Sequence, residues 1–82
     1  MDNTKIYVGN INYTADNKIL VEFFSKFGEI LEVMLIPDSR TGKHKGYGFI
    51  TFATPEEAKQ ALSADGQELL GRNLKISLAK KS

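Results

Sequence analysis

The sequence predicts a single α+β domain in which a four-stranded antiparallel sheet carries two helices on one face. The chain has 82 residues, enough for one small domain and too few for two. Hydrophobic residues make up 41% and charged residues 26%, values close to those of globular proteins. Strand and helix patterns follow one another in the order βαββαβ. Two helices can cover only one face of such a sheet, so we expect the other face to be open.

The first strand and the first helix are predicted from residues 6–28. Residues 6–8 are β-branched or aromatic, and Gly9 follows them as a strand terminator. Thr14 is the expected N-cap of a helix over 15–27, and Gly28 is placed to end that helix. The helix has one apolar face, which consists of Leu20, Phe23, Phe24 and Phe27.

The middle of the chain predicts two strands joined by a polar loop. The second strand is expected over 30–36, because Pro37 follows it. Residues 38–45 are polar and too numerous for a tight turn, and Gly42 suits a positive φ there. The third strand is expected over 47–52.

The last third predicts the second helix and the final strand. Thr54 as N-cap, Pro55 at the first helical position and Glu57 three residues on form a capping box. Residues 69–70 before a glycine suggest a short extra strand. Apolar and polar residues alternate over 74–78, which is typical of a half-buried strand.

Strand alternation decides which side chains reach the open face of the sheet. Burying the aliphatic residues of the first and third strands under the helices leaves three aromatic residues on the open face: Tyr7, Tyr47 and Phe49. Exposed aromatic rings can stack on nucleic-acid bases. The alternative is that they form cross-strand pairs that only stabilise the sheet.

Composition excludes several classes of site. The chain has no cysteine and one histidine, so a disulfide framework, a thiolate or multi-histidine metal site and a cysteine nucleophile are all excluded. No pair of acids has a reason to lie close together, and we expect no catalysis and no cofactor. The longest apolar run is far too short for a membrane span, and the N-terminus does not resemble a signal peptide. We therefore expect a soluble, cytoplasmic protein, or a nuclear one if the chain is a fragment of a eukaryotic protein.

Positive charge is concentrated in two stretches, although the formal net charge is only +1. Residues 39–51 hold Arg40, Lys43 and Lys45 and no acid. Residues 66–82 hold four basic residues against Glu68. Such charge is either ordinary solvated surface or the margin of a site for an anionic polymer.

Two segments resemble the signatures of the RNA recognition motif (RRM) family. The segment 45–52, Lys-Gly-Tyr-Gly-Phe-Ile-Thr-Phe, is similar to the RNP1 motif at every position if Ile50 is allowed in place of valine. The segment 6–11, Ile-Tyr-Val-Gly-Asn-Ile, resembles the RNP2 motif. The resemblance covers essentially the whole chain, 1–82, with a domain core at about 4–80. It implies a ferredoxin-like fold and binding of single-stranded RNA.

The resemblance implies that the first and third strands are central neighbours, so that Tyr7 and Phe49 lie side by side. It also implies roles for individual residues. Residues at the positions of Tyr7 and Phe49 stack on successive bases in the family, the residue at Tyr47 packs against sugars, and the basic residue at Lys45 contacts phosphate. It places Met34 and Ile36 of the second strand on the same face.

The remaining candidates lie on the last strand, beyond it and in the polar loop. Lys75 and Ser77 point outward if Leu74 and Ile76 point inward, and Lys80 follows the strand. Lys80 and Lys81 either lie over the sheet or remain in solvent. The loop residues Arg40, Lys43 and His44 either close on a nucleic acid or are simply solvated, and Asn10 is expected to fix a turn. Gly48 is expected to allow a helix to pack closely on the sheet.

The expected partner is single-stranded RNA of about two to four nucleotides, bound by a monomer. Single-stranded DNA is left open, because stacking does not read the 2′-hydroxyl. One alternative is a protein-binding variant of the fold; such relatives carry an Arg-x-Phe motif where this chain has Arg72-Asn73-Leu74. The other is an enzyme on a ferredoxin-like sandwich such as an acylphosphatase, whose arginine-bearing phosphate loop has no counterpart here. The length also resembles that of small stand-alone bacterial RRM proteins.

Overall fold

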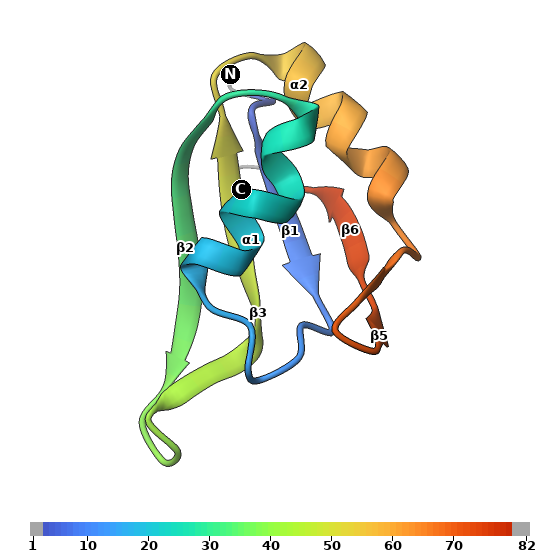
Figure 1. Ribbon diagram of the computed structural model, residues 1–82. Coiled ribbons are helices and arrows are strands. Elements are labelled where there is room, and N and C mark those ends of the chain that lie inside the picture. Colours follow the sequence, from blue (N-terminus) through green and yellow to red (C-terminus); the bar gives the residue numbers. More distant parts are fainter. Residues whose placement is uncertain (1–2, 80–82) are drawn as a thin grey trace.

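The computed structural model describes residues 3–79 and has the predicted α+β architecture (Figure 1). One antiparallel sheet has the strand order β2-β3-β1-β6. Its bounds are Lys5–Gly9 for β1, Ile30–Asp38 for β2, Lys43–Phe52 for β3 and Lys75–Leu78 for β6. The helices α1 (Asn17–Phe24) and α2 (Pro55–Ala61) lie on the same face of this sheet. Among residues 3–79, no other helix or strand lies over the opposite face, and no helix is long and apolar enough to cross a membrane.

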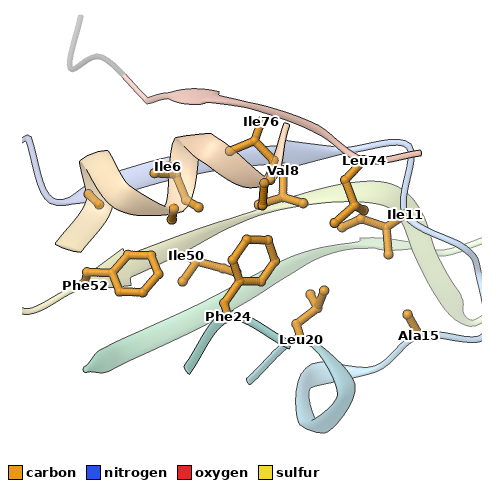
Figure 2. Packing of buried hydrophobic residues seen from close by; sticks show 13 residues of the cluster. Ile6, Val8, Ile11, Ala15, Leu20, Phe24, Ile50, Phe52, Leu74 and Ile76 are labelled. Atoms are coloured by element: carbon orange, nitrogen blue, oxygen red, sulfur yellow. The ribbon is translucent and has the colours of Figure 1, made fainter. Parts of the chain in front are cut away.

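The hydrophobic core lies between the two helices and the inner face of the sheet (Figure 2). Strands β1 and β3 contribute every second residue, which is the alternation that the sequence predicts. Helix α1 adds Leu20 and Phe24, and its predicted partners Phe23 and Phe27 are half-buried at the margin. The fully buried large side chains are Phe24, Phe52, Ile6, Ile11, Leu20, Ile50, Leu74 and Val8.

Helix α1 begins later than the sequence predicts, and the predicted N-cap is wrong. The N–H and the hydroxyl of Thr14 both donate to Asn12 Oδ1, at 2.9 and 2.8 Å, so this side chain is used in the preceding turn. Asp16 caps the helix instead, because its Oδ1 accepts the N–H of Ile19 at 3.0 Å. The last predicted turn of the helix is a 3₁₀ turn over Ser25–Phe27.

The hairpin between β2 and β3 is more regular than the sequence predicts. Pro37 does not end β2, which continues to Asp38. β2 is an edge strand of the sheet, where the missing N–H of proline is tolerated, and the register shifts between Leu35 and Pro37. β3 starts at Lys43, which reduces the loop to residues 39–42, and Gly42 has the predicted positive φ of 76°.

The second half of the chain follows the prediction closely. Thr54 and Glu57 form the complete capping box of α2, with Pro55 in the first turn. The helix continues as a 3₁₀ turn over Leu62–Ala64. The short extra strand expected over 69–70 lies one residue earlier, as β4 (Glu68–Leu69), and pairs with β5 (Arg72–Asn73) in a small hairpin. Both turn residues of this hairpin, Leu70 and Gly71, have positive φ, as a two-residue hairpin turn of type I′ requires.

Candidate nucleic-acid interface

Four of the predicted site residues form one row across the open face of the sheet. Met34 of β2 pairs with Phe49 of β3, Phe49 pairs with Tyr7 of β1, and Tyr7 pairs with Ser77 of β6. We call Met34, Phe49, Tyr7 and Ser77 the central row. Because each member is the direct cross-strand neighbour of the next, their side chains are about 5 Å apart at Cβ. The row is therefore a continuous surface from one edge of the sheet to the other.

The three predicted aromatic rings lie together on this face. The ring centroids of Tyr7 and Phe49 are 5.8 Å apart with an interplanar angle of 66°. Those of Tyr7 and Tyr47 are 6.0 Å apart at 36°. All three side chains are half-buried, and Met34 beside Phe49 is 43% exposed. The rings support one another through edge and tilted contacts and still present surface to solvent.

Gly9 allows the Tyr7 ring to lie along the sheet. A Cβ at this position would be 2.5 Å from the Tyr7 hydroxyl oxygen, 2.9 Å from Cζ and 3.0 Å from Cε2. Residues 7 and 9 point to the same face of β1, so the outer end of the ring occupies the space of the missing side chain. The sequence pattern predicts Gly9 only as a strand terminator; the alternation of residues 7 and 9 is the signal for this second role.

Gly48 does not have the role predicted for it. Its Cβ would overlap the main-chain carbonyl oxygen of Met34 and lie 3.0 Å from Leu35 Cα, so it accommodates the neighbouring strand β2 and not a helix. In the same region β3 bulges, because Leu35 pairs with Gly48 whereas Pro37 pairs with His44. This is the part of β3 that carries Lys45, whose side chain is exposed. The predicted phosphate contact thus lies on a bulge beside the aromatic rings.

The remaining predicted residues flank the central row. Lys75 is exposed, pairs with Gly9, and alternates with the buried Ile76, so it lies on the open face as predicted. Ile36 is half-buried on β2, opposite the bulge of β3. Lys80 lies outside the described residues, as does Lys81.

One further cation lies on this face and was not predicted. Lys5 Nζ is 5.9 Å from the centroid of the Phe49 ring. Lys5 pairs with Thr51, which also faces Glu32 of β2, so an acid lies at the same end of the sheet. The alternation that placed Tyr7 on this face also indicated Lys5, two residues earlier.

His44 is buried, although the sequence placed it in a solvated loop. Its side chain is 7% exposed, Nε2 is 2.9 Å from the carbonyl oxygen of Ala15, and Nδ1 accepts the N–H of Gly46 at 2.9 Å. These two bonds suit the neutral tautomer that is protonated at Nε2. His44 therefore holds the bulge of β3 to the start of the first helix, and a direct role in ligand binding is not available to the buried ring.

Asn10 has the predicted structural role. It has a positive φ of 57°, its Nδ2 donates to the carbonyl oxygen of Asn73 at 2.7 Å, and its Oδ1 accepts from Arg72 Nη1 at 3.2 Å. These bonds connect the end of β1 to the β4–β5 hairpin. The amide is thus engaged within the protein.

Comparison of the sequence with protein-family models identifies the family of this chain. The model of the RNA recognition motif family matches residues 6–75. The chain belongs to the RNA recognition motif family. Of its two signature segments, 6–11 begins in β1 and runs two residues past its end, and 45–52 lies within β3; these strands are neighbours at the centre of the RRM sheet.

The similar proteins of known function are longer than this chain. Glycine-rich RNA-binding protein 5, mitochondrial, of Arabidopsis thaliana is 43% identical over 79 residues, which cover 96% of this chain and 27% of that protein. Glycine-rich RNA-binding protein blt801 of Hordeum vulgare is 38% identical over 76 residues, which cover 92% of this chain and 47% of that protein. This RRM chain therefore spans about a quarter to a half of the length of these relatives.

Solved structures share the whole fold of the RRM chain. RNA binding protein PG1 superposes with a TM-score of 0.88 at 30% identity, covering 96% of both chains. The RRM of Rna15 with bound RNA (GU) superposes with a TM-score of 0.85 at 28% identity, covering 94% of this chain and 83% of that one. The ferredoxin-like βαββαβ sandwich predicted from the sequence is thereby confirmed.

Proposed function

We propose that this RRM binds single-stranded RNA on the open face of its sheet by stacking bases on Tyr7 and Phe49. The observation that carries the proposal is the central row, in which these two rings are paired neighbours on the two middle strands. Membership of the RRM family and the names of the relatives as RNA-binding proteins support it.

The surroundings of the two rings supply the other contacts. Tyr47 continues the aromatic surface toward the bulge of β3, where it packs against a ribose. Lys45 on β3 and Lys75 on β6 contribute positive charge beside the rings for phosphate contacts. Met34, Ile36 and Ser77 extend the surface to both edges of the sheet. We also include Lys80, which follows β6 in the sequence, as a cation for a phosphate contact.

The composition of the surface limits the affinity. The two stacking platforms Tyr7 and Phe49, at about 1–3 kcal/mol each, give a gross stabilisation of about 2–6 kcal/mol. A micromolar dissociation constant corresponds to about 8 kcal/mol, which stacking alone does not reach once association and ordering costs are subtracted. Sugar and phosphate contacts have to supply the remainder, so we expect dissociation constants in the micromolar range or weaker. With a formal net charge of only +1, recognition depends more on stacking than on long-range attraction.

The competing assignments receive less support. A protein-binding variant of the fold has no need of Tyr7, Tyr47 and Phe49 on the open face, and this chain keeps all three.

We further propose that the domain acts as a non-enzymatic monomer that needs no cofactor. Single-stranded DNA remains a candidate ligand, because stacking alone does not distinguish it from RNA. Cytoplasmic location stays a prediction, since one relative described above is named as mitochondrial, and bacterial type also stays a prediction, since both relatives come from plants.

The test is a titration of fluorescein-labelled random RNA of about four nucleotides with the wild-type protein and a Tyr7→Leu/Phe49→Leu double variant. Leucine keeps an apolar side chain at each position, which preserves packing, and removes the flat ring. Val21→Ala on α1 serves as the control, because Val21 is 39% exposed and lies on the helical side. We expect the double variant to lose at least tenfold in affinity while the control retains it. Equal affinities for all three proteins would contradict the stacking mechanism.

A further inference from the structure

A fourth exposed aromatic ring lies outside the open face and outside the core. Tyr13, in the segment between β1 and α1, is 51% exposed. Its ring centroid is 5.9 Å from that of His44 and 5.8 Å from the guanidinium carbon of Arg72. The ring therefore partly covers the buried His44 and leaves half of its surface in solvent. A purely structural cover for His44 does not require an aromatic residue with so much exposed area.

Tyr13 forms the wall between two shallow hollows. One, of about 780 Å³, lies between the start of α1 and the end of the β2–β3 hairpin, and the other, of about 570 Å³, lies against the hairpin turn. Both are lined by Tyr13 and Lys43. We call this region the Tyr13 site. Figure 1 shows that the β2–β3 hairpin, the segment before α1 and β5 all lie at the same end of the sheet.

The main chain that carries Tyr13 is held from two sides. The N–H of Ile11 donates to the carbonyl oxygen of Gly46 at 2.8 Å, which ties it to β3. Asn12 Nδ2 donates to the carbonyl oxygen of Leu70 at 2.9 Å, which ties it to the β4–β5 hairpin. A ring on a fixed main chain loses little conformational entropy when it binds a ligand.

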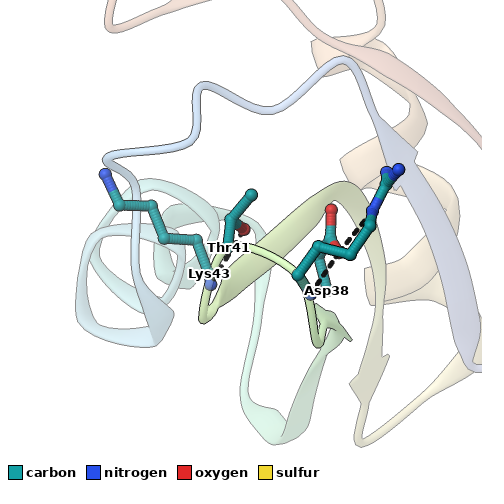
Figure 3. A network of polar contacts seen from close by, with 4 residues as sticks. Asp38, Thr41 and Lys43 are labelled. Atoms are coloured by element: carbon teal, nitrogen blue, oxygen red, sulfur yellow. Dashed lines mark hydrogen bonds and ion pairs between the residues drawn. The ribbon is translucent and has the colours of Figure 1, made fainter.

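The hairpin turn beside the Tyr13 site is organised by its own polar contacts (Figure 3). The N–H of Arg40 donates to Asp38 Oδ1 at 3.0 Å, and the guanidinium of Arg40 is 3.5 Å from the same oxygen. The N–H of Lys43 donates to Thr41 Oγ1 at 3.2 Å, while its side chain extends away from the turn. The main chain is thus fixed and the Lys43 ammonium group is presented at the edge of both hollows.

The charge around the Tyr13 site favours an anionic ligand. Its acids, Asp16 and Asp38, are both engaged: Asp16 caps α1, and Asp38 pairs with Arg40. Four cations lie around it, Lys18, Lys43, Arg72 and the paired Arg40, so a surplus of two positive charges remains when both acids are counted. An exposed aromatic ring with surplus positive charge has the chemistry of a base-stacking and phosphate-binding position.

The Tyr13 site adjoins the open face at the bulge of β3. A Cβ on Gly46 would lie 3.6 Å from Tyr13 Cε1, and Gly46 stands between Lys45 and Tyr47 on that bulge. A strand that passes over Tyr47 and leaves the open face at the bulge would come within reach of Tyr13. We propose that Tyr13 stacks on one additional base of the same RNA strand, beyond those on the sheet, and that Lys43 contacts its phosphate. The proposal rests on the proposed RNA-binding function and extends the bound length.

The test compares two lengths of fluorescein-labelled random RNA, about four and about eight nucleotides, on Tyr13→Leu and Tyr13→Phe variants. We expect Tyr13→Leu to lose about five- to a hundred-fold in affinity for the longer RNA and to match the wild type on the shorter one. Tyr13→Phe, which keeps the ring, retains the affinity for both. Unchanged binding of the longer RNA by Tyr13→Leu would overturn the proposal, as would equal losses at both lengths, which indicate a structural disturbance.

A Tyr13→Trp variant gives a second, direct measurement, because the chain has no other tryptophan. We expect its emission to be quenched by the longer RNA and not by the shorter one. Absence of quenching by bound longer RNA would also overturn the proposal. Failure of the proposed function itself is distinguishable, because binding of the shorter RNA would then not depend on Tyr7 and Phe49.

Discussion

We predict that substituting Gly9 with alanine lowers the affinity for RNA without lowering the free energy of unfolding. The contacts around Gly9 allow the size of each effect to be worked out. The added Cβ would be 2.5 Å from the Tyr7 hydroxyl oxygen, whereas ordinary contacts begin near 3.4 Å. The outer end of the Tyr7 ring must therefore rise from the sheet by roughly 1 Å. The backbone need not move, because every atom that the Cβ would meet within 3.0 Å belongs to this one side chain.

Gly9→Ala is expected to weaken RNA binding and to leave the fold at least as stable. A complete base–aromatic stack contributes about 1–3 kcal/mol, and a tilted ring keeps part of it, so we expect Gly9→Ala to cost about 1 kcal/mol of binding. That is about a fivefold loss in affinity. Alanine in a strand interior is favoured over glycine by about 0.5–1 kcal/mol. Because Gly9 is the last residue of β1, we expect at most this gain, and the free energy of unfolding stays level or rises slightly.

The assay combines RNA titration with urea unfolding for the wild type, Gly9→Ala, Tyr7→Ala and the double variant. If Gly9 acts through the Tyr7 ring, its substitution has no further effect on affinity once that ring is removed, and the cycle shows full coupling. Wild-type affinity in Gly9→Ala would refute the reasoning. A loss of the same size in the Tyr7→Ala background would refute it too, because Gly9 would then act independently of the ring.

Three further predictions follow from other parts of the molecule. Neutralising about two to four phosphates gives a slope of about −1.4 to −2.8 for the logarithm of the association constant against that of salt concentration, and a slope near zero excludes phosphate contacts. Thr54→Ala removes the capping box formed with Glu57 and lowers the free energy of unfolding by about 0.5–2 kcal/mol. RNA affinity should not change, and a change would contradict the placement of the binding site on the face opposite α2. His44→Phe leaves the N–H of Gly46 and the carbonyl of Ala15 without their partner. We expect urea unfolding to show a free energy of unfolding lower by about 1–3 kcal/mol. Unchanged stability would show that these bonds contribute nothing.

The faces of the strands could be predicted from sequence because alternation is a local property. Assigning Ile6, Val8 and Ile50 to the core was sufficient to place Tyr7 and Phe49 on the open face. That these two rings are direct neighbours came from the family resemblance, since nothing in the sequence pattern alone specifies the strand order β2-β3-β1-β6. The RNA contacts assigned to individual residues remain predictions.

The errors arise where a side chain has a partner far along the chain or two local uses compete. His44 was placed in solvent because its bond to Ala15 spans 29 residues and has no sequence signature. The local pattern favours Thr14 as the N-cap, but the turn with Asn12 competes for the same hydroxyl. Gly48 was assigned to a helix contact, whereas it accommodates a neighbouring strand whose register shifts at a bulge. Such shifts depend on both strands together.

The central claim is that RNA lies across the open face of the sheet, on the central row. The most direct measurement is a map of amide and aromatic NMR chemical-shift changes during titration with a short RNA. We predict the largest changes at Tyr7, Phe49 and Ser77, and small ones at Ala58 and Ala61 of α2 on the opposite side. Changes centred on the helices, with the aromatic signals of the open face unmoved, would contradict the account.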